Sequence, residues 1–127
     1  MVSLSVSPAS LTDARADLTT VAGVTGDAGF TEAADASYTG QGATGRLTIT
    51  VSAPTQENTA NEGRVDGTDL TWTALNSMTL TGMLIYKFIT DDSSSIPIAF
   101  YDFSSDVVCN GGDVQVAWNA SGILNTT

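Results

Sequence analysis

An apolar run between Thr79 and Thr90, TLTGMLIYKFIT, restricts the fold more than any other feature of this 127-residue sequence. Successive residues of a β-strand point to opposite faces, and both faces of this segment are apolar. One face carries Leu80, Leu84, Tyr86 and Phe88, and the other carries Met83, Ile85 and Ile89. Such a strand needs cover on both sides, so we expect it to be the central strand of a sheet.

Alternation of apolar and polar residues predicts three of four further strands, and the fourth, IPIAFYDF, is another strand with two apolar faces. They are RLTITVSA (46–53), DLTWTAL (69–75), IPIAFYDF (96–103) and DVQVAWN (113–119). In the first, the apolar residues share one face and Arg46 lies on the opposite, outward face. In the last, Trp118 shares a face with Val114 and Val116, so we expect it to be buried.

The connections between these strands are rich in turn residues. DDSSS (91–95) separates the two most apolar strands at hairpin length, and NGG (110–112) supplies residues that accept a positive φ. Residues 68–127 are therefore expected to form an antiparallel meander. We predict one mainly β domain over residues 1–127, an antiparallel β-sandwich or barrel-like fold with at most one short helix.

The first half of the chain has weaker patterns. Within residues 1–52, the segment 9–23 fits one short helix, with Ser10 or Thr12 as its cap and Gly23 at its end. Residues 53–67 are polar, and Val65 is their only large apolar residue. This stretch is expected to be an exposed loop or arm between the two halves.

Charge and hydropathy exclude several classes of partner. The chain has 14 acidic and 4 basic residues, no histidine and a formal net charge of −10. Binding to nucleic acid needs clustered Lys and Arg, so we expect no nucleic-acid partner. The run from Met83 to Ile89 is interrupted by Lys87 and is far too short to span a bilayer, so we expect no membrane association and no signal peptide.

The residue types needed for catalysis are scarce. Without histidine the single cysteine, Cys109, has no base to activate it, and it reads as a small buried hydrophobe. The acidic pairs Asp91–Asp92 and Asp66–Asp69 are the only candidates for an ion site, and neither follows a known calcium-loop pattern. We therefore predict a protein that is not an enzyme and has no cofactor.

Lys87 is unusual because it interrupts an otherwise apolar strand. One interpretation is that its stem packs on the sheet while its amine reaches the edge. The other is an ion pair across a subunit interface. We retain Lys87 as a candidate interface residue.

Several positions in the second half together resemble small tailed-phage virion proteins, a group that includes capsid decoration (cement) proteins. The matching positions are Thr71-Trp72, Tyr86-Lys87, Pro97, Asp102-Phe103, Asn110-Gly111, Trp118-Asn119 and Gly122-Ile123-Leu124. The first half does not share the group's pattern. The resemblance implies a structural virion component, located on the capsid surface, with no catalytic residues.

The expected function is therefore to bind the major capsid protein on the outside of a bacteriophage shell and stabilise it. The first half has too few large apolar residues to supply all the cover that the apolar second half needs, which predicts a homo-oligomer. A homotrimer fits the threefold positions that decoration proteins occupy, with Ile123 and Leu124 in the interface beside Lys87. The alternative is a tail or head-fibre module that binds host carbohydrate through an exposed Trp or Tyr.

Overall fold

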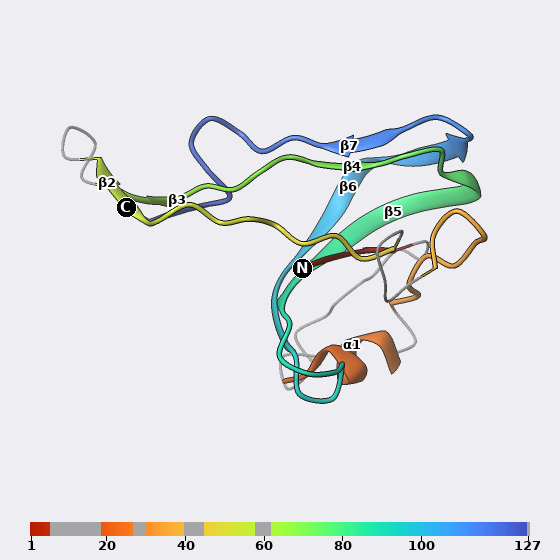
Figure 1. Ribbon diagram of the computed structural model, residues 1–127, viewed down its shortest axis with the longest axis horizontal. Coiled ribbons are helices and arrows are strands. Elements are labelled where there is room, and N and C mark those ends of the chain that lie inside the picture. Colours follow the sequence, from red (N-terminus) through yellow and green to blue (C-terminus); the bar gives the residue numbers. More distant parts are fainter. Residues whose placement is uncertain (6–18, 27–29, 40–44, 58–61, 127) are drawn as a thin grey trace.

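The computed structural model describes residues 1–5, 19–26, 30–39, 45–57 and 62–126 (Figure 1). In order along the chain, its elements are β1 (Val2–Ser5), α1 (Val21–Gly26), β2 (Thr55–Glu57), β3 (Glu62–Val65), β4 (Leu70–Trp72), β5 (Asn76–Lys87), β6 (Ile96–Asn110), β7 (Val114–Val116) and β8 (Leu124–Thr126). They form three antiparallel sheets of order β1-β5-β6, β2-β3-β8 and β4-β7. The prediction of a mainly β, antiparallel fold with one short helix is confirmed for the described residues.

β5 is the central strand, as its sequence predicts. All of its residues from Leu80 to Tyr86 are buried, and the strand pairs with β1 on one edge and with β6 on the other. Leu84 and Tyr86 face one apolar cluster, whereas Leu80, Met83 and Ile85 face another. Leu80 thus packs on the opposite face from the one expected, next to an irregularity in the ladder, where the register between β5 and β6 shifts between Leu80 and Gly82.

The N-terminal half supplies more cover than its composition suggests. Val21 and Val24 of α1 pack with Phe30 against Leu84 and Tyr86, and the Phe30 ring meets Phe100 edge-on at 5.9 Å between centroids. The sequence predicts that this half is too poor in large apolar residues to supply all of the cover, but on this face of β5 it does supply it. Few large apolar residues suffice here because each is almost completely buried.

The helix α1 overlaps the end of the predicted segment 9–23 and continues beyond it to Gly26. Its N-terminus is capped by Thr20, whose Oγ1 accepts a hydrogen bond from the Gly23 amide at 3.2 Å. Gly23 consequently lies inside α1 and does not end it. The two expected caps, Ser10 and Thr12, lie outside the described residues.

The second half forms two hairpin-like pairs, one inside the other, and the predicted meander is wrong. β5 and β6 pair across the loop 88–95, but β7 turns away at Gly111, where φ is +93°, and pairs with β4. This pairing encloses Trp72, whose Nε1–H donates to the Gly45 carbonyl at 2.6 Å. Trp118 is half-buried, not fully buried, and its Nε1–H donates to the Thr68 carbonyl at 3.0 Å.

The predicted loop 53–67 contains a hairpin. β2 pairs with β3, and β3 pairs with β8 from the end of the chain, so the predicted interface segment completes this small sheet. We call β2, β3 and β8 the arm, because they extend away from β5 and β6 at the left of Figure 1. The predicted strand 46–53 leads into the arm and makes only isolated bridges, at Leu47 and Val51.

Candidate interaction surface

The acidic residues considered as ion ligands hold loops in place instead. Asp91 Oδ1 accepts hydrogen bonds from Ser93 Oγ at 2.7 Å and from the Ser94 amide at 2.9 Å, and these bonds lower the Asp91 pKa. Asp66 accepts from the Gly67 amide, and Asp69 accepts from the Trp118 amide. Among the described residues, no group of three or more His, Cys, Asp or Glu side chains is arranged to hold a metal.

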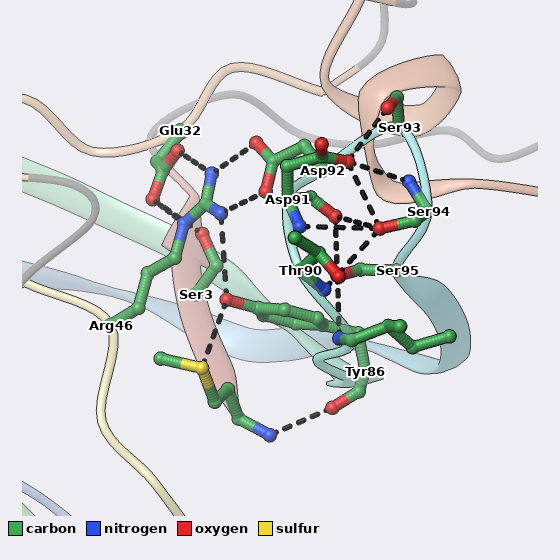
Figure 2. A network of polar contacts seen from close by, with 12 residues as sticks. Ser3, Glu32, Arg46, Tyr86, Thr90, Asp91, Asp92, Ser93, Ser94 and Ser95 are labelled. Carbon is green, nitrogen blue, oxygen red and sulfur yellow. Dashed lines mark hydrogen bonds and ion pairs between the residues drawn. The ribbon is translucent and has the colours of Figure 1, made fainter.

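Asp92 belongs to a buried ion cluster with Glu32 and Arg46 (Figure 2). The Arg46 guanidinium donates to both oxygens of Glu32, at 2.6 and 2.5 Å, and to both oxygens of Asp92, at 2.5 and 3.0 Å. Its side chain is 3% exposed, whereas those of Glu32 and Asp92 are 19% and 23% exposed. Two bidentate pairs use the planar fork of arginine in a way that lysine cannot reproduce.

Two tyrosines complete the polar shell of this ion cluster. The Arg46 Cζ lies 5.6 Å from the Tyr86 ring centroid, and Tyr38 OH donates to Glu32 at 3.3 Å. Burial alone would lower the Arg46 pKa, but the hydrogen bonds that Arg46 donates to Glu32 and Asp92 outweigh it and raise that pKa. Burial raises the pKa of both tyrosines. The cluster therefore links residues from three distant parts of the chain. It favours the charged form of Arg46 and the protonated form of both tyrosines.

The sequence analysis missed this cluster and placed Arg46 on an outward face. The error arose because strand alternation says nothing about partners 14 and 46 positions away. One sequence feature pointed toward it: only 4 of the 18 charged residues are basic, so a buried cation has carboxylates available at many positions.

An apolar hollow of about 200 Å³ lies where the arm joins the body of the molecule. All of its lining residues are apolar: Ile49, Val51, Val65, Ile85, Ile98, Ala99 and Ile123. They come from the segment leading into the arm, from β3, from the residue before β8, and from β5 and β6. Here the arm meets β5 and β6, and their side chains do not fill the space between them.

A β-bulge directs Ile98 toward the mouth of this hollow. Ile85 pairs with Ala99 and Tyr86 pairs with Pro97, so Ile98 is an extra residue on β6. Consecutive residues of a regular strand face opposite sides, yet Ile98 and Ala99 both line the hollow. The bulge leaves the Ile98 side chain 55% exposed.

Further apolar side chains are exposed at the end of the β5–β6 ribbon. Phe88 and Ile89 follow β5 and are 43% and 48% exposed, and Ile96 begins β6 at 46%. The prediction that Phe88 and Ile89 are covered like the rest of their strand is wrong, because β5 ends at Lys87. Together with Val51 and Ile98, these residues leave large aliphatic and aromatic groups in contact with water.

The three predicted interface residues do not form a single group. Lys87 is exposed at the last position of β5, opposite Ile96, and it makes no ion pair with the described residues. Ile123 is half-buried and lines the hollow. The Leu124 backbone pairs with Val65 in the arm. Lys87 and Ile123 thus mark two different apolar places on the surface.

The remaining sequence candidate, Cys109, is buried, and burial raises its thiol pKa, as expected for a small hydrophobe. The helix in the described part of the chain, at six residues, is too short to cross a bilayer. No protein-family model, curated protein or solved structure matches the chain.

Proposed function

We propose that this protein is a non-enzymatic structural component of a bacteriophage virion, a capsid decoration (cement) protein that binds the major capsid protein from outside. The observation that carries the proposal is the apolar hollow, together with a second group of exposed apolar residues at the end of the β5–β6 ribbon, on an otherwise acidic chain. Large exposed apolar groups of this kind are typical of surfaces that bind other proteins. The sequence resemblance of the second half supplies the identity of the partner.

The acidic surface is compatible with a location on the shell. A net charge of −10 keeps the free protein soluble and discourages contact with packaged nucleic acid. The hollow itself is lined without charged residues, so it offers a site where an acidic protein can dock with little repulsion. We also propose that the protein self-associates, as a trimer, to match the threefold positions of a capsid.

The aromatic residues favour this function over a carbohydrate-binding fibre module. The expected carbohydrate site needs an exposed Trp or Tyr, but Trp72, Tyr38 and Tyr86 are buried. The Trp118 indole is half-buried, and its N–H is already bonded to Thr68. Tyr101, at 37% exposure, is the most accessible of the described Trp and Tyr side chains.

Co-sedimentation with empty capsids tests the proposal. Purified protein would be mixed with capsids assembled from the major capsid protein of the same genome, and bound protein would be counted per capsid subunit. We expect saturable binding and a higher temperature of capsid disruption. Absence of binding, combined with retention on immobilised host polysaccharide, would reject the decoration function in favour of the fibre module.

A further inference from the structure

We infer that the apolar hollow is a self-association site and that its occupant is the Phe88 side chain of a second copy of this chain. The inference rests on the self-association proposed above and specifies where the contact lies. Both parts of the contact are present on one molecule: a hollow without an internal occupant, and an exposed aromatic ring at the end of the β5–β6 ribbon.

The size of the hollow suits one aromatic side chain. Its volume is about 200 Å³, and an apolar protein cavity of ~150 Å³ is enough to bind benzene. Most small-molecule sites are larger, on the order of 300–1,000 Å³, and include a few polar groups that orient the ligand. A lining made only of aliphatic side chains provides no such groups, so an inserted phenyl ring fits better than a metabolite.

The charged residues that directly neighbour the two places in sequence are opposite in sign. Lys87 precedes Phe88 and has no ion pair with the described residues. Of the two acidic residues in the same loop, Asp92 is paired with Arg46, whereas Asp91 is exposed and accepts hydrogen bonds from the serines of its own loop (Figure 2). On the other side, exposed Asp66 follows Val65 of the hollow. Insertion of Phe88 would bring a cation toward this carboxylate, which favours one orientation of the contact.

The edge of β6 is a poorer route to self-association. Within the described residues β6 has no strand on its outer edge, which leaves backbone groups unpaired. Pro97, the bulge at Ile98 and the irregular stretch 103–106 interrupt that edge, however, and each of these features disfavours strand addition. Contact through side chains at the hollow avoids these obstacles.

Light scattering during size-exclusion chromatography tests the inference. We expect the parent protein to be oligomeric at micromolar concentration. Phe88→Asp and Ile98→Asp should each weaken association at least tenfold, because one removes the ring and the other charges the mouth of the hollow. The matched control is Val108→Asp, a change at a 70% exposed position of the same strand that should leave the oligomer intact.

Disulfide trapping provides evidence that does not depend on these charged variants folding well. Phe88→Cys and Ile98→Cys, each combined with Cys109→Ala, would be mixed and oxidised. We expect a crosslinked product containing one copy of each variant, and a Val108→Cys partner in place of Ile98→Cys should give none.

Three results would overturn the inference: a monomeric parent, association unaffected by Phe88→Asp, or equal loss with Val108→Asp. Capsid co-sedimentation separates this failure from failure of the proposed function. A monomeric parent that binds capsids, loses binding with Ile98→Asp and keeps it with Phe88→Asp would assign the hollow to the capsid protein. Self-association through Phe88 without capsid binding would keep this contact and reject the decoration function.

Discussion

The two faces of β5 have very different surroundings. On the face of Leu84 and Tyr86, α1 and Phe30 close the core, and the ion cluster of Arg46 seals it with bonded polar groups. On the face of Ile85, the core opens into the apolar hollow beside the arm. Every buried side-chain nitrogen and oxygen among the described residues has a hydrogen-bond partner. The closed face is thus complete within one chain, whereas the open face lacks apolar contacts that a second molecule could supply.

The largest expected effect comes from breaking the closed face. Arg46→Ala leaves Glu32 and Asp92 without their shared cation in a poorly hydrated site. Removing one partner of a buried ion pair costs about 3–5 kcal/mol, and the partial exposure of both carboxylates favours the lower end. Urea denaturation measures the change.

The matched control for this variant is Arg64→Ala. Arg64 pairs with Glu62 at 3.1 Å, but its side chain is 32% exposed. Loss of such an exposed pair should cost about 0–1 kcal/mol. Equal losses for the two arginine variants would mean that the ion cluster does not stabilise the closed face.

Neighbouring residues of β5 provide a second comparison of the two faces. Leu84 is 1% exposed on the closed face, and Ile85 is 6% exposed on the open face. Leu84→Ala should cost about 4 kcal/mol and Ile85→Ala about 2–3 kcal/mol, because Ile85 already borders unfilled space. Chemical denaturation at low protein concentration tests this order, and a larger cost for Ile85→Ala would contradict the contrast.

Alkaline pH should weaken the closed face. Burial raises the pKa of Tyr38 and Tyr86, so both stay protonated when the tyrosines of the unfolded chain ionise near pH ~10. Above that pH the unfolded state binds fewer protons than the folded state. The free energy of unfolding should therefore be constant with respect to these groups below pH ~10 and fall above it, by up to ~1.4 kcal/mol per pH unit for each tyrosine.

Tyr38→Phe isolates one of these groups. The variant should show a smaller fall in the free energy of unfolding between pH 10 and pH 11 than the parent, as measured by urea titration at each pH. An unchanged slope would show that Tyr38 ionises alike in both states. The hollow is lined without titratable side chains, so self-association should not change through its lining in this range.

The smallest expected effect belongs to Ile98. Because its side chain is 55% exposed on a bulge, Ile98→Ala should reduce the stability of the monomer by less than about 1 kcal/mol. The same change should weaken self-association if Ile98 forms the mouth of the contact site. Dilution to concentrations where the parent is monomeric, followed by thermal denaturation, separates the two effects.

The sequence predicts those parts of the fold that depend on neighbouring residues. The apolar residues of β5 predict this strand by themselves, and the residues of DDSSS and NGG predict the two turns because they accept turn conformations. The pairing of β4 with β7 could not be read locally, because a period-two pattern defines a face but not a neighbour. The expected meander was wrong for that reason.

The candidate surface was harder to predict than the fold. Ile98 faces the hollow only because a bulge changes the register of β6, and Ile123 reaches it only because the end of the chain returns to β3. Arg46 finds Glu32 and Asp92 through tertiary packing. Lys87 and Ile123 were nevertheless selected from sequence, because each breaks or ends an apolar pattern.

The pairing of β1 with β5 has a consequence for folding during synthesis. Val2 pairs with Ile85, so β1 leaves the ribosome roughly 80 residues before its partner strand. At about 5–20 residues per second, this corresponds to a wait on the order of 4–16 s. The β5–β6 hairpin joins residues close in sequence and can form first, whereas β1 must close a long loop. Until then one edge of the most apolar strand is open to other nascent chains, so the slow step of folding coincides with the period of greatest aggregation risk.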